Sequence, residues 1–412
     1  MRILIENSGY DLDNLGDACM LQVLFERLRS NFPRAEFGVI TRDSRRLALY
    51  CPGARPVPAE HNRGWEQARN LYTRLRRVTP RLETAIRAWT PALHDRLQRF
   101  RGQHSVARSA VRGAELFVVS GGGFINDVFR GQSWSVFERI HAALKRGTVV
   151  ALFGQGIGPL RDPALVEKAR EVLPGAGLIA LREKLTSLPA LERLGVPRER
   201  ILITGDDAVE PAYSARAEDV GDKLGVNLRV AGYAQVTRAM VAAIREPLQE
   251  TARRLKSHMM ALPVTVSGGV ESAPDAAAAA ELINGARDSA EASEEPRDPR
   301  ALIERIGKCR VVVTGSYHAA VFALSQGIQA VCLANSEYYE LKFRGLADQF
   351  GAGVEVLSLS DNLFGQRLVE TTLNAWARAE SLRPRLLRAA VRQLSAGRAA
   401  HERLREIVET RR

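Results

Sequence analysis

The residues most suited to chemistry lie in one stretch, which reads VVVTGSYHAAVFALSQGIQAVCLANSEYYELKFRG over residues 311–345. His318 stands between an apolar run typical of a β-strand and the segment AAVFALS, which is typical of a helix. At such a junction the imidazole faces the carboxyl edge of a parallel sheet, and the helix dipole lowers its pKa. His318 is therefore a candidate proton donor or base, the alternative being a packing histidine.

Cationic and aromatic side chains follow the next strand of the same stretch. Lys342 and Arg344 are candidate ligands for an anionic substrate, and Tyr338 can stack on a sugar or hydrogen-bond to it. Lys342 is one of only seven lysines among 59 basic residues. A lysine in such an arginine-rich chain indicates a position at which the ammonium group itself is required.

Charged residues also end three other apolar runs. Arg182 ends LIALRE, Arg229 ends GVNLR, and Asp206 and Asp207 end ILITGDD. Ligands of open α/β sheets bind beyond the carboxyl ends of the strands, so we expect these side chains at a crevice. The arginines suit an anion, and the aspartates suit sugar hydroxyls or a metal. No third carboxylate or histidine lies close by in the sequence, so we predict no metal site.

Glycines gather at three further strand ends. The segment NLGDACML places Asn14 and Asp17 at the start of a helix, where backbone amides attract anions, although Asp17 can equally be a simple helix cap. Gly122 and Gly123 follow ELFVVS, and Gln155 lies in FGQGIGP. Neither glycine cluster fits a dinucleotide fingerprint or a P-loop. The glycines either form tight turns or line the cleft with their backbone. We expect the second, because the two clusters follow adjacent parallel strands.

Short apolar runs alternate with helix-period segments along most of the chain, which is typical of βα units in parallel sheets. A first series precedes a link at residues 211–222 and a second series follows it. We therefore predict two Rossmann-like doubly wound domains, residues 1–215 and 216–412. Their facing sheet edges would form a cleft in a GT-B-like arrangement.

Two segments depart from this rhythm. Residues 43–112 contain no clear strand but many arginines, so we expect a basic helical insertion in the first domain. It is either a solvated hairpin or an arm that contacts the acceptor or the inner face of a membrane. Residues 362–412 are expected to form one or two helices, broken near Pro384 and packed outside the second domain.

Composition narrows the class of protein. The formal charge of +12 favours anionic partners, but aromatics make up only 6% of the chain and no basic-aromatic stripe occurs, so nucleic acid is not expected. The chain enters a strand at once, has no long apolar run, and its four cysteines have no C-x-x-C spacing. We expect a cytoplasmic protein with free thiols, with contact to the membrane surface as an option.

The ordered set of motifs resembles the polysaccharide pyruvyl transferase family over nearly the whole chain outside the two departing segments. The resemblance rests on the N-x-G-D opening at Asn14, the triple glycine at 121–123, GQGIGPL, Arg182-Glu183 with Ser187, Asp206-Asp207, GVNLR, and His318 followed by Lys342. Many members have Arg-Leu-His where this chain has Ser316, Tyr317 and His318, and a proline where it has Gln329.

The resemblance implies a GT-B-like fold, phosphoenolpyruvate as the donor substrate, no other cofactor, and a pyruvate ketal formed on a glycan or a lipid-linked oligosaccharide. It implies that His318 is the catalytic acid and that Arg182 and Lys342 bind the donor. Two other functions stay open: a GT-B glycosyltransferase that uses a nucleotide sugar, and an inert glycan-binding protein. The residues name neither the acceptor sugar nor an oligomeric state.

Overall fold

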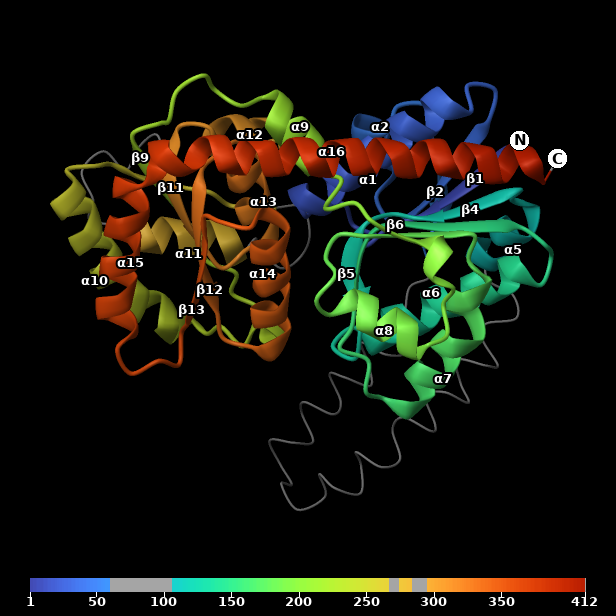
Figure 1. The fold of residues 1–412 in the computed structure, drawn as a ribbon, viewed down its shortest axis with the longest axis horizontal. Coiled ribbons are helices and arrows are strands. Elements are labelled where there is room, and N and C mark those ends of the chain that lie inside the picture. The colour runs from blue at the N-terminus through green and yellow to red at the C-terminus, as the bar shows by residue number, and fades with distance from the viewer. Residues whose placement is uncertain (60–105, 267–273, 284–294, 412) are drawn as a thin grey trace, which may run out of the picture.

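The computed structural model describes residues 1–59, 106–266, 274–283 and 295–411. It contains two α/β domains side by side, bridged by one long C-terminal helix (Figure 1). Each domain is a parallel sheet covered by helices, which confirms the predicted pair of Rossmann-like domains. In the described part of the chain, no helix is long and apolar enough to cross a membrane.

The first sheet has eight described strands in the order β3-β2-β1-β4-β6-β7-β8, with β5 paired to the end of β6. Its buried runs are rich in Val, Ile, Leu and Phe, as parallel strands covered on both faces require. The strands are β1 Arg2–Glu6, β2 Glu36–Thr41, β3 Arg55–Pro58, β4 Leu116–Val119, β5 Gly122–Ile125, β6 Val149–Ile157, β7 Leu178–Leu181 and β8 Ile201–Ile203.

The helices of the first domain connect these strands. They are α1 Leu15–Asn31, α2 Ser44–Tyr50, α5 Val106–Gly113, α6 Arg130–Leu144, α7 Pro163–Val172, α8 Ser187–Arg193 and α9 Val209–Ser214, with short 3₁₀ helices at Leu173–Gly175 and Arg198–Arg200. Asp162 caps α7, where its side chain accepts a hydrogen bond from the Leu165 amide at 3.0 Å. The sequence signal of Asp followed by Pro therefore marks a true helix start.

The second sheet has the order β10-β9-β11-β12-β13, again all parallel. Its strands are β9 Lys223–Asn227, β10 Met259–Ala261, β11 Cys309–Thr314, β12 Gln329–Ala334 and β13 Val354–Ser358. The 3₁₀ helix Gly232–Ala234 and the following helices cover it: α10 Arg238–Leu255, α11 Pro274–Ile283, α12 Pro299–Ile306, α13 Tyr317–Ser325, α14 Glu337–Phe350, α15 Phe364–Ala377 and α16 Ala379–Thr410.

The expectation of a strandless insertion over residues 43–112 is wrong at its beginning. Residues 55–58 form β3, which extends the sheet beside β2 in parallel register, and α2 precedes it. The segment RPVP was missed because Pro is rare inside strands, but β3 is the edge strand, where Pro is tolerated. The arginine-rich part and its two tryptophans fall within 60–105, outside the described residues.

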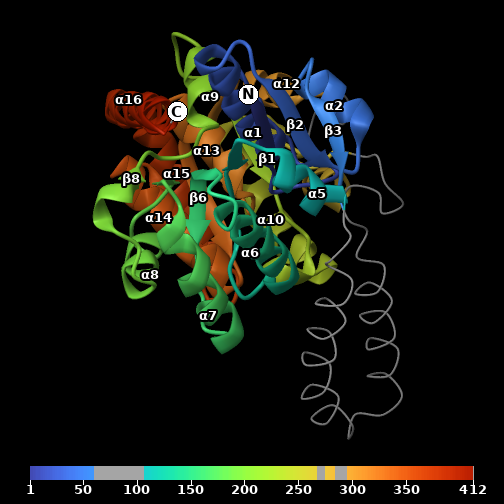
Figure 2. The same cartoon turned by 90° about the vertical axis from the view of Figure 1, so that its right-hand side faces the viewer.

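The C-terminal expectation also needs correction. The break between the two helices lies at Arg378, and α16 runs through Pro384, which lies in its second turn. This helix does not stay outside the second domain but crosses both domains (Figure 1), and Figure 2 views it nearly along its axis. Its first half buries Leu386 and Ala390 in the core of the second domain, and its second half buries Leu404 and Val408 in that of the first.

The two domains also meet through α1 and α9, whose residues join the core of the second domain. The Leu15 amide donates to the Val264 carbonyl at 2.9 Å, and the Val266 amide donates to the Asp13 carbonyl at 2.9 Å. In the first sheet the order of the strands reverses between β1 and β4, and in the second sheet it reverses between β9 and β11. Ligands of such sheets bind at these switch points, and here the two switch points face each other.

Candidate active site

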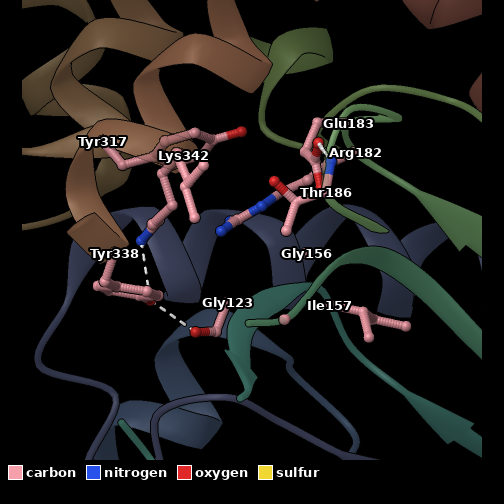
Figure 3. A pocket seen from close by; sticks show the side chains of 11 residues that line it. Gly123, Gly156, Ile157, Arg182, Glu183, Thr186, Tyr317, Tyr338 and Lys342 are labelled. Carbon is pink, nitrogen blue, oxygen red and sulfur yellow. Dashed lines mark hydrogen bonds between the residues drawn. The ribbon is translucent and has the colours of Figure 1, made fainter. Parts of the chain in front are cut away.

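A pocket lies between the domains at the carboxyl ends of the strands (Figure 3). Its free space is about 330 Å³, including the part open to solvent. The first domain contributes Gly123, Gly156, Ile157, Gly158, Arg182, Glu183 and Thr186, and the second contributes Tyr317, Tyr338, Leu341 and Lys342. The predicted cleft therefore exists, and both domains supply a cation to it.

Arg182 directly follows β7 and is only 3% exposed. Its guanidinium carbon lies 4.1 Å from the centre of the Tyr317 ring, and Nη1 lies 3.6 Å from Oδ2 of Asp206. The chain passes close to the guanidinium because residues 123 and 156 are glycines: a Cβ on Gly123 would lie 2.4 Å from Nη2 of Arg182. Glycine here leaves room for the cation and for a ligand beside it.

Lys342 reaches the pocket from the opposite side, on α14 (Figure 3). Its ammonium donates to the Tyr338 hydroxyl at 3.1 Å, and that hydroxyl donates to the Gly123 carbonyl at 2.6 Å. Within the described residues no carboxylate lies within ion-pair distance of this ammonium. Burial and the Arg182 charge hold the pKa of Lys342 well below its usual range, and a bound anion would oppose both effects.

His318 opens α13 and is 6% exposed. It packs on the first turn of α1, where a Cβ on Gly16 would lie 1.9 Å from Cγ of the imidazole. Nδ1 lies 4.0 Å from Oδ1 of Asp17, and Nε2 lies 3.9 Å from Oδ2 of Asp206. Burial, Arg182 and Lys342 hold its pKa well below 6.5, so the imidazole is neutral in the free protein.

The two carboxyl groups beside His318 are also perturbed. Burial raises the pKa of Asp17 to about 6 against the opposing effects of Lys342 and Arg182. Burial likewise raises the pKa of Asp206, while Arg182 opposes that shift. A cluster of two cations, two carboxyls and one imidazole thus lies where the two switch points meet, and strongly shifted groups in a cleft are typical of active sites.

Three of the predicted binding residues shape the site without lining the pocket. Asn14 caps α1, where its side chain accepts from the Gly16 and Asp17 amides at 3.0 and 3.2 Å. Gln155 is fully buried and donates to the Ser120 carbonyl at 2.6 Å, which ties β6 to the end of β4. Gly122 allows close packing, because a Cβ there would lie 2.6 Å from Ser8 Cβ.

Three others point elsewhere. Asp207 turns away from its neighbour Asp206, and its Oδ1 lies 3.6 Å from Nη1 of Arg27. Arg229 pairs with the buried Asp275 at 2.9 Å, so its charge is already matched inside the second domain. Arg344 is exposed on α14 and pairs with Glu340 one turn earlier.

Sequence reasoning missed Tyr317, Glu183 and Thr186 as pocket residues. Tyr317 stands immediately before His318, so an aromatic residue next to the candidate acid was the available signal. Glu183 was noted only as part of a motif. Its carboxylate accepts from the amides of Thr186 and Ser187, both at 2.9 Å, and so fixes the loop that carries Arg182.

The fold and this cleft together define a GT-B-like protein with a small cationic site between its domains. The model of the family described as polysaccharide pyruvyl transferase matches residues 14–337, and the chain belongs to that family. A search among curated proteins gives no match.

Solved structures with the same fold act on nucleotide sugars or carry other ligands. UDP-GlcNAc 2-epimerase from Neisseria meningitidis, bound to UDP-GlcNAc, has a TM-score of 0.56 and 11% identity, covering 97% of each chain. LpCGTa in complex with UDP has a TM-score of 0.56 and 11% identity over 99% of this chain and 98% of that one. UGT89C1 of Arabidopsis thaliana, complexed with quercetin, has a TM-score of 0.53 and 9% identity over 99% and 98%. At this identity the likeness concerns the fold alone.

Proposed function

We propose that the protein transfers a pyruvyl group from phosphoenolpyruvate to a sugar of a cell-surface polysaccharide or its precursor, forming a pyruvate ketal. One observation carries the proposal: Arg182 and Lys342, from opposite domains, converge on a narrow glycine-lined pocket beside His318. Phosphoenolpyruvate carries a phosphate and a carboxylate on three carbons, so it needs two cations close together. Family membership supports the reaction class.

The size of the pocket supports a small donor. Its free space is only about 330 Å³ even with open solvent included, so the enclosed part is smaller still. Tyr317 and Tyr338 occupy the side of the pocket that faces the second domain. A nucleotide sugar would require these rings to move, whereas a three-carbon anion suits the existing walls.

The chemistry needs a proton donor for the methylene carbon of the donor. Protonation there creates an oxocarbenium-like centre, which a sugar hydroxyl attacks. Loss of phosphate and attack by a second hydroxyl then close the ketal. His318 is the candidate acid because, among the described histidines, it lies beside both donor-binding cations. His141 is half-buried on α6, His258 is exposed directly before β10, and His401 is buried on α16.

Thermal unfolding with phosphoenolpyruvate tests the donor. At one hundred times the dissociation constant we expect about 2.7 kcal/mol of stabilisation, and little from UDP. Arg182→Met should abolish the effect, whereas Arg344→Met, which removes an exposed cation of α14, should preserve it. Stabilisation by UDP without any effect of phosphoenolpyruvate would overturn the proposal.

The second candidate function is glycosyl transfer from a nucleotide sugar. Its support is the fold alone, because similar structures are bound to UDP or UDP-GlcNAc. It predicts binding of UDP, and the same unfolding experiment decides between the two. An inert glycan-binding protein would bind glycan and neither donor.

A further inference from the structure

Two buried polar atoms face each other without a hydrogen bond, next to Arg182 of the pocket. They are Nε2 of His318 and Oδ2 of Asp206, 3.9 Å apart, and neither has a hydrogen-bond partner in the described part of the chain. Leaving such a buried group unpaired destabilises the protein. The two side chains are 7% and 1% exposed, so bulk water does not relieve that cost.

Charged and titratable groups surround His318 from four elements. Asp17 on α1 lies 4.0 Å from Nδ1, and Asp206 after β8 faces Nε2. Arg182 after β7 and Lys342 on α14 act on the imidazole through their charges. On α13 itself, the Tyr317 ring meets the imidazole edge-on, with 5.4 Å between ring centres. The imidazole thus has carboxyls on both sides and two cations nearby.

Asp206 stands between the donor-binding cation and the candidate acid. The same oxygen, Oδ2, lies 3.6 Å from Nη1 of Arg182 and 3.9 Å from Nε2 of His318. Both distances are too long for a hydrogen bond, so small movements can pair this oxygen with either group. Asp17 differs, because its side chain is 23% exposed, whereas the side chain of Asp206 is 1% exposed.

We propose that Asp206 is the positioning residue for His318, and that an anionic donor bound by Arg182 and Lys342 enables His318 to take up the proton that it delivers. This inference rests on the proposed function. In the free protein Arg182 competes for Asp206, and burial together with the two cations keeps the imidazole neutral. The donor occupies Arg182 and screens both cations. Asp206 then accepts a hydrogen bond from Nε2–H and stabilises the imidazolium.

The proton balance follows from this arrangement. On donor binding, a proton passes from solvent to His318. The Nδ1–H bond of the imidazolium then breaks and leaves its electron pair on nitrogen, while the electron pair of the donor's double bond forms the new C–H bond at the methylene carbon. The first sugar hydroxyl adds to the neighbouring carbon and releases its proton to solvent. The second hydroxyl displaces phosphate, which departs with the electron pair of its C–O bond and takes up the proton of that hydroxyl. No oxidant or reductant is required.

Proton uptake on binding phosphoenolpyruvate is the direct test. Calorimetric titrations above pH 7, in buffers of different ionisation enthalpy, give the number of protons taken up. The difference between wild type and His318→Gln gives the share of His318. We expect this share to be substantial in wild type and to fall at least about threefold when the same comparison is made in an Asp206→Asn background. An equal share in both backgrounds would overturn the proposal.

Kinetics of Asp206→Asn separate positioning from a structural role. We expect kcat to fall about 10- to 100-fold and its alkaline limb to move to lower pH, because the imidazolium loses its partner. Donor affinity should stay equal or rise, since Arg182 loses a competing carboxylate. Asp207→Asn, whose carboxyl points toward Arg27, is the matched control and should leave the alkaline limb in place. An unmoved limb in Asp206→Asn, or the same displacement in both variants, would contradict the proposal.

A measurement on the wild type covers the case in which Asp206→Asn does not fold. With histidine labelled for NMR, and the His318 signal assigned by its loss in His318→Gln, the pKa of His318 should rise by at least about one unit on addition of phosphoenolpyruvate. An unchanged value would refute donor-linked protonation. Failure of phosphoenolpyruvate to bind at all would instead refute the proposed function.

Discussion

His318 can approach the first domain closely only because residue 16 is glycine. The imidazole fills the place where any other side chain would begin, 1.9 Å from an added Cβ. Tyr317 has a comparable role for the cations, since its ring lies within 4.1 Å of the Arg182 guanidinium and 5.0 Å of the Lys342 ammonium. Single residues at the domain junction therefore determine where His318, Arg182 and Lys342 lie.

Replacing Gly16 by alanine should impair the reaction without removing any reacting group. The methyl group would displace His318 or separate the domains, so we expect turnover to fall at least about a hundredfold, the size of a general-acid contribution. Steady-state kinetics measure this loss. Gly131→Ala on α6 is the control, because an added Cβ there meets no atom within 4 Å. Near-normal turnover of Gly16→Ala would mean that His318 can move freely.

Donor affinity should depend on the protonation of Lys342. Its pKa is depressed in the free protein, and an anion stabilises the charged form. Donor affinity is therefore highest at pH values below the pKa of Lys342 in the free protein. Above that pKa it weakens by up to about tenfold per pH unit, until the pH reaches the pKa of Lys342 in the complex. Calorimetry between pH 7 and 9 should show this slope in wild type and a smaller one in Lys342→Arg, which stays charged. Equal slopes would exclude Lys342 as the titrating group.

At the scale of elements, α14 is the part of the second domain that contacts the first over its whole length. At the start of the helix, Glu337 pairs with Arg161 and Tyr338 donates to the Gly123 carbonyl at 2.6 Å. Near its end, the Gln349 side chain donates to the Arg182 carbonyl at 3.1 Å. Gly345 permits this approach, because a Cβ there would lie 2.8 Å from Cγ of Glu183. The helix thus carries Lys342 into the pocket and holds the cleft closed.

Tyr338→Phe should weaken the hold of α14 on the first domain. The variant loses the hydrogen bond to Gly123 and the oxygen that orients the Lys342 ammonium. At about 0.5–1.5 kcal/mol per hydrogen bond, we expect donor affinity to fall roughly 2- to 13-fold for each bond lost. Tyr339→Phe is the control, because the Tyr339 hydroxyl makes no hydrogen bond with any other described residue. If both variants bind the donor with the affinity of wild type, Tyr338 does not have this role.

The elements themselves could be predicted from the sequence because apolar runs ending in Gly, Ser or Asp mark parallel strands. The junction at His318 and the strand end at Arg182 follow from that pattern. The local pattern could not reveal the direction of each side chain: Asp206 and Asp207 are neighbours, yet Asp206 faces Arg182 and Asp207 faces Arg27. Arg229 and Arg344 looked equally suitable, but their carboxylate partners, Asp275 and Glu340, are visible only in the fold.

At the scale of the whole molecule, α16 and α1 join the two domains behind the cleft. Arg27 on α1 pairs with Glu210 on α9, and Arg398 on α16 binds the same carboxylate at 2.9 Å. His401 stacks on Phe153 with ring centres 4.1 Å apart. Asp207 lies beside these contacts, 3.6 Å from Arg27. It therefore connects the segment after β8, which also carries Asp206, to the helices that join the domains.

Asp207 should make the folded protein less stable as pH rises. Burial raises its pKa to about 7, above the value near 4 expected for the unfolded chain. Between about pH 4 and pH 7, the folded state therefore keeps a proton on Asp207 that the unfolded state has lost. Over this interval the free energy of unfolding declines by up to about 1.4 kcal/mol per pH unit. Urea unfolding at pH 5 and pH 8 should show a smaller decline in Asp207→Asn. Asp11→Asn, at a largely exposed carboxyl, is the control, and an equal decline in all three proteins would contradict this account.

Transfer of pyruvate from phosphoenolpyruvate to a sugar can be tested in the complete reaction. The most direct measurement is to incubate the protein with phosphoenolpyruvate and a panel of candidate glycans, while following phosphate release and the mass of the glycan. We expect phosphate release that requires an acceptor, a glycan heavier by one pyruvate ketal, and loss of both products in His318→Gln and Lys342→Met. Glycosyl transfer from a nucleotide sugar by the same preparation, with no phosphate released from phosphoenolpyruvate across the panel, would contradict the account.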